Sequence, residues 1–112
     1  RAALWADERG AAEPFVQALM RAYWAEGQDI SDVAVLARLA SGVGLDGVAE
    51  AIDDARIKAA IEANGREAID RGLFGVPTAV FRGKLYFGTD HLDLLDRHMA
   101  RWRASAGEES RP

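Results

Sequence analysis

The stretch that decides the fold runs from Gly72 to Asp90 and reads GLFGVPTAVFRGKLYFGTD. It is rich in β-branched and aromatic residues, which predicts short strands over residues 78–81 and 84–87. Arg82-Gly83 supplies a two-residue turn between them. Pro77 stands directly before the first strand, and proline cannot donate a hydrogen bond to a neighbouring strand. We therefore expect the backbone beside Pro77 to meet a ligand.

The composition is that of a single globular domain. The chain has 112 residues, which is enough for one domain and too few for two. Hydrophobic residues make up 49% and charged residues 29% of the sequence, which excludes a disordered or a membrane protein. The net charge of -4 predicts no nucleic-acid partner and no binding to an anionic membrane. The chain contains no cysteine and so supplies no thiol of its own.

Apolar residues at helical spacing dominate the region before Gly72. Ser31 and Asp46 are the expected N-caps of the third and fourth helices, and Asn64-Gly65 allows a kink in the fifth. The helices are expected over residues 2–9, from Pro14 to about Gly27, over 32–40, over 46–52, and from Asp53 or Asp54 to about Arg71. The expected buried positions are Phe15, Leu19, Ala22 and Tyr23 in the second helix, and Ile57, Ile61, Ala68 and Ile69 in the fifth.

After the hairpin, Gly88-Thr89-Asp90 opens a last helix, and its end from Ser105 onward is small, polar and expected to fray. Its apolar stripe is expected at Leu92, Leu95, Met99 and Trp102. This divides the chain into a helical region (1–71), a hairpin with its helix (72–105) and a polar tail (106–112). A lone hairpin cannot bury a face by itself. We therefore expect it to be the edge of a larger sheet whose other strands precede Arg1.

The order of these motifs resembles the C-terminal half of a DsbA-like thioredoxin-fold protein. A helical region is followed by Gly-Leu-Phe-Gly-Val-Pro-Thr at residues 72–78, a hairpin, Phe-Gly-Thr-Asp at residues 87–90 and a final helix. Within that family the chain most resembles 2-hydroxychromene-2-carboxylate isomerases, which are relatives of kappa-class glutathione transferases. Residues 22–30 and 44–46 are similar to the helical insertion of those enzymes. The resemblance implies an α/β, thioredoxin-like fold with a helical insertion in residues 1–71.

The same resemblance implies where the reactive group lies. Family members carry a strand–helix–strand unit and their reactive residue before the region that matches this chain. That residue is a serine in the isomerases and a Cys-X-X-Cys pair in the oxidoreductases. The 112 residues contain no counterpart, so we expect the catalytic residue upstream of Arg1.

The resemblance further implies a glutathione site at Val76, Pro77, Thr89 and Asp90. In such proteins the proline that matches Pro77 is cis, and the backbone of the residue that matches Val76 pairs with the cysteinyl unit of glutathione. Thr89 and Asp90 would hold the γ-glutamyl end beside a helix N-terminus. Two plainer interpretations stay open. Gly75-Val76-Pro77 could be a rigid lead into an edge strand, and Thr89 and Asp90 could be ordinary helix caps.

Other candidate residues carry weaker signals. Tyr23 and Trp24 would line a pocket for an aromatic substrate, as the helical insertion does in relatives, or they belong to the core. His91 and His98 lie seven positions apart without a third ligand at metal-binding spacing, so we expect no metal site. For both histidines we expect surface or capping roles.

Three functions remain open on the sequence. The first is a glutathione-dependent isomerase that takes a small aromatic carboxylate, 2-hydroxychromene-2-carboxylate in relatives, as its substrate. It implies a cytoplasmic protein with glutathione as its cofactor, and it leaves a homodimer open. The second is a DsbA-like thiol-disulfide oxidoreductase with an upstream Cys-X-X-Cys pair. The third is a non-enzymatic helical module that is completed by dimerisation.

Overall fold

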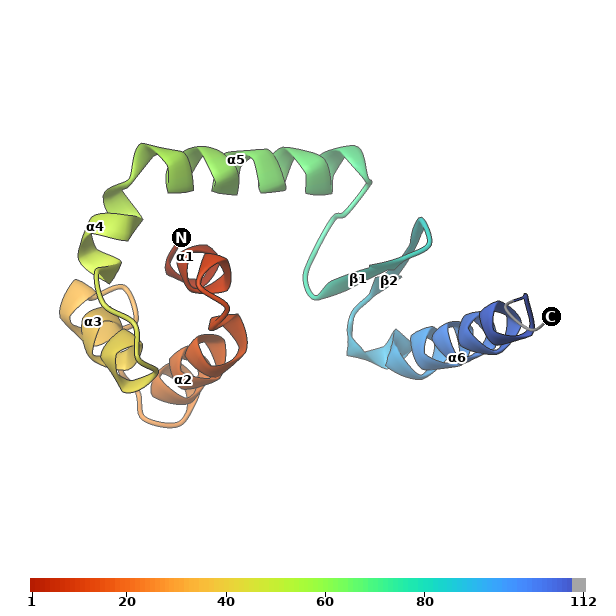
Figure 1. Ribbon diagram of the computed structural model, residues 1–112, viewed down its shortest axis with the longest axis horizontal. Coiled ribbons are helices and arrows are strands. Elements are labelled where there is room, and N and C mark those ends of the chain that lie inside the picture. Colours follow the sequence, from red (N-terminus) through yellow and green to blue (C-terminus); the bar gives the residue numbers. More distant parts are fainter. Residues whose placement is uncertain (110–112) are drawn as a thin grey trace. The chain divides into compact units, whose positions relative to one another are not determined.

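The computed structural model describes residues 1–109, and the chain divides into two compact units at Arg66 and Glu67. The first unit contains α1 (Ala2–Glu8), α2 (Ala12–Trp24), α3 (Val33–Gly42), α4 (Val48–Asp53) and most of α5 (Ala55–Asp70) (Figure 1). The second unit contains the end of α5, the strands β1 (Thr78–Phe81) and β2 (Lys84–Phe87), the short 3-10 helix η1 (Thr89–His91) and α6 (Leu92–Glu109).

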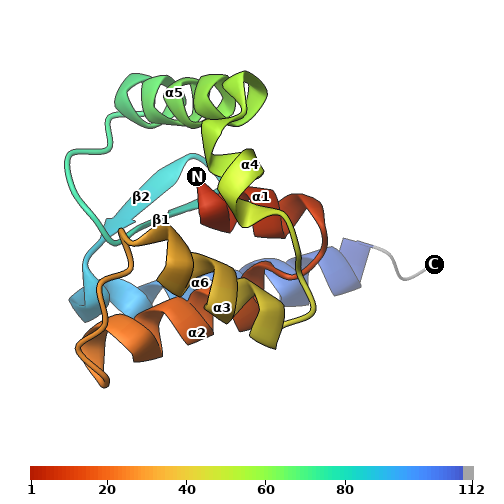
Figure 2. The same cartoon turned by 90° about the vertical axis from the view of Figure 1, so that its left-hand side faces the viewer.

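A hydrophobic core holds the first unit together. Trp5 of α1 and Phe15 of α2 are buried and meet edge to face, with ring centroids 6.4 Å apart. Leu36 of α3, Val48 of α4 and Ile57 of α5 complete the core. Burying each side chain of this size stabilises the folded state by about 1.5–3 kcal/mol. Two perpendicular views show α1 to α4 as one cluster (Figures 1 and 2).

The stripe predicted for α2 is correct except at Tyr23. Phe15, Leu19 and Ala22 are buried, whereas Tyr23 is about half exposed. A helix turns by about 100° per residue, so Tyr23 points about 80° away from Phe15 and lies at the edge of the stripe. The interpretation of Tyr23 and its neighbour Trp24 as core residues is therefore wrong.

Side-chain hydrogen bonds cap the starts of α3 and α5, whereas α4 begins without one. Asp32, and not Ser31, caps α3, because its side chain accepts a hydrogen bond of 2.9 Å from the backbone of Ala34. The hydroxyl of Ser31 donates to Asp29 instead, which lowers the pKa of that carboxyl. The cap of α4 is Gly47 rather than the predicted Asp46, and α4 has no side-chain cap. Asp54 was one of the two predicted caps of α5, and its side chain does accept a hydrogen bond from the backbone N–H of Arg56.

The fifth helix is continuous, and Figure 1 draws α5 without a kink at the predicted position. Of the four residues predicted on its buried side, only Ile57 is fully buried. Ala68 is half-buried, Ile61 is exposed and Ile69 is 73% exposed. The reason is that only the first turns of α5 meet the core of the first unit, which ends at Arg66.

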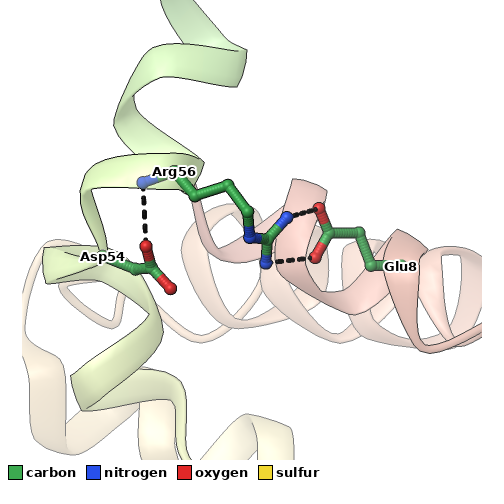
Figure 3. A network of polar contacts seen from close by, with 3 residues as sticks. All are labelled: Glu8, Asp54 and Arg56. Atoms are coloured by element: carbon green, nitrogen blue, oxygen red, sulfur yellow. Dashed lines mark hydrogen bonds and ion pairs between the residues drawn. The ribbon is translucent and has the colours of Figure 1, made fainter.

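An ion pair ties the end of α1 to the start of α5. The guanidinium of Arg56 donates two hydrogen bonds, of 2.6 and 2.9 Å, to the two carboxylate oxygens of Glu8 (Figure 3). The backbone N–H of Arg56 also donates to the capping carboxylate of Asp54, at 2.8 Å. The hydrogen bonds from Arg56 lower the pKa of Glu8 and, in turn, raise that of Arg56. Such a bidentate ion pair fixes the relative orientation of the guanidinium and the carboxylate as well as the distance between them.

The hairpin has the predicted bounds. β1 and β2 are antiparallel, with Thr78 opposite Phe87 and Phe81 opposite Lys84. Arg82 and Gly83 both have positive φ, 51° and 81°, which is the backbone of a type I′ turn. Glycine adopts this conformation at no steric cost, which explains why a two-residue turn ending in glycine predicts the hairpin so well.

The two faces of the hairpin differ. Ala79 and Tyr86 share the face toward α6, and Tyr86 is 4% exposed. The opposite face carries Val80, Leu85 and Phe87, of which Val80 and Phe87 remain exposed. Within the described residues the sheet has these two strands only. The further strands expected before Arg1 stay a prediction.

The last helix is longer than predicted. α6 continues to Glu109, past the expected start of fraying at Ser105, and residues 110–112 of the predicted tail lie outside the described residues. Leu95 and Met99 of its predicted stripe are half-buried, whereas Leu92 is exposed. None of the helices within residues 1–109 combines the length and the apolar character needed to cross a membrane.

Candidate functional site

The candidate site lies in the second unit, where the chain passes from α5 into β1. After α5, the backbone N–H groups of Gly72 and Leu73 donate to the carbonyls of Ile69 and Ala68, at 2.9 and 3.0 Å, and end the helix. The chain then runs through Phe74, Gly75 and Val76 to Pro77. We refer to residues 73–77 as the proline loop.

Gly75 lets the proline loop lie directly on β2. A Cβ atom at Gly75 would be 2.8 Å from Cε2 of Phe87, closer than such atoms approach one another. The ring of Phe87 also contacts that of Phe74, with centroids 4.7 Å apart. The hydroxyl of Thr78 donates to the carbonyl of Gly75 at 2.6 Å. Together these contacts hold the loop against the end of the hairpin.

Val76 presents an unpaired stretch of backbone. Its side chain is 87% exposed, and within residues 1–109 neither its N–H nor its C=O makes a hydrogen bond. The Val76–Pro77 peptide bond is cis, the isomer that the family resemblance implies. Backbone groups without partners can pair with an added extended peptide. Val76 therefore offers the donor and the acceptor that such a peptide needs.

Pro77 is joined to the start of the last helical segment. Its carbonyl accepts a hydrogen bond of 2.8 Å from the backbone N–H of Gly88. Thr89 and Asp90 follow Gly88 in η1. The structure thus brings the four predicted site residues to one end of the hairpin, two of them from the proline loop and two from η1.

Thr89 and Asp90 are not helix caps. The N-cap of η1 is Gly88, and no side chain caps it. Both side chains are exposed, and among the described residues neither makes a hydrogen bond or an ion pair. The interpretation as ordinary caps is therefore wrong. A hydroxyl and a carboxylate remain available beside an unpaired backbone, which suits the charged end of a peptide-like ligand.

Tyr23 and Trp24 lie in the first unit, at the end of α2. Their rings meet edge to face with centroids 4.8 Å apart, and Trp24 is 77% exposed. This leaves aromatic surface open at the end of α2. Their role at a substrate pocket stays a prediction.

The sequence did not reveal the contact between Tyr86 and His98. The hydroxyl of Tyr86 and Nδ1 of His98 form a hydrogen bond, and both residues are at least half-buried. The expected surface or capping role of His98 is therefore wrong. His91 is exposed, as expected. Within the described part of the chain, no three His, Cys, Asp or Glu side chains gather at a metal-binding distance.

Comparison with known proteins gives two matches. Residues 1–100 match the family model described as a DSBA-like thioredoxin domain. The chain is also 33% identical over 102 residues to a 2-hydroxychromene-2-carboxylate isomerase from Sphingobium xenophagum. That alignment covers 88% of this chain and 51% of the isomerase, so the chain spans about half the length of this curated relative. No solved structure gives a significant match.

Proposed function

Because this chain belongs to the family of DsbA-like thioredoxin domains, we propose that it forms the glutathione-binding part of an isomerase. The proposed substrate is 2-hydroxychromene-2-carboxylate or a similar small aromatic carboxylate, after the name of the isomerase that the chain matches at 33% identity. The observation that carries the proposal is the unpaired backbone of Val76 at the same end of the hairpin as Thr89 and Asp90.

Each of these residues has a distinct part in holding glutathione. The N–H and C=O of Val76 would pair with the cysteinyl unit, as in the addition of one short strand. Asp90 would accept hydrogen bonds from the α-ammonium group of the γ-glutamyl end. The hydroxyl of Thr89 and the N–H groups at the start of η1 would donate to its carboxylate. The hydrogen bond between Gly88 and Pro77 keeps the two halves of this site together.

Glutathione would supply a thiolate, the competent nucleophile of thiol chemistry. This chain has no cysteine, and its described residues would position that thiol rather than activate it. The proposal places the activating serine on a segment that precedes Arg1. In this proposal, the exposed rings of Tyr23 and Trp24 contact the aromatic substrate.

The same backbone would serve a thiol-disulfide oxidoreductase, the second function that the family allows. There Val76 would receive a substrate peptide, and an extended peptide needs no carboxylate at Asp90 for its binding. The role of Asp90 therefore separates the two functions.

The test is a calorimetric titration of reduced glutathione into the protein and into its Asp90→Ala variant. Loss of a charge-assisted hydrogen bond costs about 1–3 kcal/mol, so we expect about 5- to 150-fold weaker binding. Asp93→Ala removes an acidic residue from the first turn of α6 and serves as the matched control. Equal affinity of Asp90→Ala and the unchanged protein would overturn the proposed role of Asp90, as would an equal loss in both variants.

A further inference from the structure

The second unit has another hollow, at the turn end of the hairpin and thus at the opposite end from Pro77 and Gly88. It is a shallow hollow that is open to solvent, and its volume is about 300 Å³, at the lower limit of the roughly 300–1,000 Å³ that is usual for small-molecule sites. We call it the turn cavity. It is lined by the rings of Phe81, Tyr86 and Trp102, the cations Arg82, Lys84 and Arg101, and the imidazole of His98.

One face of the hairpin supplies three of the seven lining residues. Phe81 and Lys84 are paired across the strands, and Tyr86 lies two positions beyond Lys84 on β2. Side chains alternate between the faces of a strand, so these three share one face. Tyr86 is 4% exposed and forms the floor, whereas Lys84 is exposed at the rim.

One face of α6 supplies three more, and the turn residue Arg82 is the seventh. His98, Arg101 and Trp102 are spaced at i, i+3 and i+4, which places them on the same side of a helix. The hydrogen bond between Tyr86 and His98 joins this face to the hairpin. The rings of Phe81 and Trp102 add an edge-to-face contact, with centroids 6.0 Å apart. These contacts orient the rings of Phe81, Tyr86 and Trp102 without a ligand.

The cations around the turn cavity have no carboxylate partner among the described side chains. Among the residues that the structure describes, Arg82, Lys84 and Arg101 form no ion pair with a carboxylate. Arg82 lies over the ring of Trp102 at 5.7 Å, and Lys84 over that of Tyr86 at 5.6 Å. Such contacts orient a cation but leave its charge in place. A cationic rim stands out in a chain whose net charge is -4.

We propose that the turn cavity binds a small aromatic molecule that carries a phosphate or another dianionic group. Its ring inserts beside Trp102, and its anionic group meets Arg82, Lys84 and Arg101. Three cations balance the charge of a dianion better than they balance that of a single carboxylate. Guanidinium groups also bind phosphate oxygens with two hydrogen bonds at once. This site is separate from the proposed glutathione site and does not depend on it.

The first test titrates 1-naphthyl phosphate into ¹⁵N-labelled protein and follows the indole N–H signals of its three tryptophans. The signal of Trp102, assigned with a Trp102→Phe variant, is expected to shift to saturation while that of the buried Trp5 stays in place. Inorganic phosphate and 1-naphthoate are expected to bind at least about tenfold more weakly. No saturable shift would overturn the site. If inorganic phosphate bound as tightly as 1-naphthyl phosphate, the proposed contact with an aromatic ring would be overturned. If 1-naphthoate bound as tightly, the proposed preference for a dianion would be overturned.

The second test removes the cations one at a time. Lys84→Gln and Arg101→Gln are each expected to weaken 1-naphthyl phosphate binding about tenfold or more, since each removes a charged hydrogen-bond donor. Both residues are exposed, so the fold is expected to persist, which circular dichroism checks. Arg97→Gln is the matched control, because Arg97 is an exposed cation of α6 that does not line the turn cavity. An equal loss in Arg97→Gln would show general charge attraction and overturn the proposal.

Discussion

At the scale of single residues, the proline loop depends on how closely Gly75 approaches Phe87. The place of a Cβ atom at Gly75 is already taken by the ring of Phe87. That ring is part of an exposed side chain and can swing outward, but it then loses its contact with Phe74. An aromatic pair of this kind contributes about 0.5–1.5 kcal/mol.

Gly75→Ala is therefore expected to lower the free energy of unfolding by about 1 kcal/mol. Gly65→Ala is the matched control, since Gly65 lies inside α5 with no atom near the place of a Cβ. This control is expected to raise the free energy of unfolding by about 0.5–1 kcal/mol. Urea unfolding measures the change in the free energy of unfolding for each of the two variants. A gain in stability for Gly75→Ala would contradict the packing that we describe for the loop.

Single residues also show where sequence reasoning stops. The sequence places Val76 and Pro77 at a ligand site, because a proline before a strand is unusual. It assigns Ser31 as a cap, whereas its neighbour Asp32 caps α3. Both residue types cap helices well, so only the backbone conformation decides between neighbours. Thr89 and Asp90 are good capping residues for the same reason, yet Gly88 occupies the N-cap.

At the scale of elements, the hairpin was predicted to the residue, because its register follows from a turn of two residues. The buried side of α5 was predicted less well. Periodicity shows which face of a helix is apolar, but it does not show how far the neighbouring helices extend along that face. Ile69 belongs to that face and is 73% exposed. The Tyr86–His98 contact was missed because it depends on how α6 packs on the strands.

The pair between Glu8 and Arg56 makes the attachment of α1 to α5 dependent on pH. Arg56 lowers the pKa of Glu8 in the folded state. The ion pair therefore makes its full contribution to the free energy of unfolding above the ordinary carboxylate pKa of about 4.3. That contribution is lost as the pH falls through the lowered pKa of Glu8. Glu8→Gln is expected to be less stable than the unchanged protein at pH 7, with the difference vanishing in acid.

The measurement is the urea midpoint of both proteins from pH 7 down to the lowest pH at which they fold. Asp7→Asn, on the same helix and exposed, controls for the loss of a carboxylate that makes no such pair. A difference between Glu8→Gln and the unchanged protein that stays constant across this range would show that the ion pair is not its cause.

At the scale of the whole molecule, buried apolar surface is concentrated in the first unit. Its core runs from Ala2 to Ile57, whereas Tyr86 is the one fully buried hydrophobic residue described in the second unit. The sequence could not give this contrast, since both parts contain similar apolar residues. Nor do two strands and several helices define a thioredoxin fold by themselves. The order of the proline and Phe-Gly-Thr-Asp motifs provided that assignment, and the family match confirms it.

We expect this contrast to appear in amide hydrogen exchange. Regions with few buried apolar contacts open more readily than a packed core. Peptides from α2 and α3 are therefore expected to exchange more slowly than peptides from β1 and β2, as mass spectrometry at neutral pH would show. Equal protection of the hairpin would mean that the exposed faces at Val80 and Phe87 are covered in solution.

The most direct test of the central claim, a glutathione site at the proline loop, is a map of backbone amide signals during titration with reduced glutathione. We expect shifts that saturate together at Val76, Thr89 and Asp90, with the amides of α1 to α4 unchanged. Shifts confined to other parts of the chain, or no saturable shift at these three amides, would contradict it.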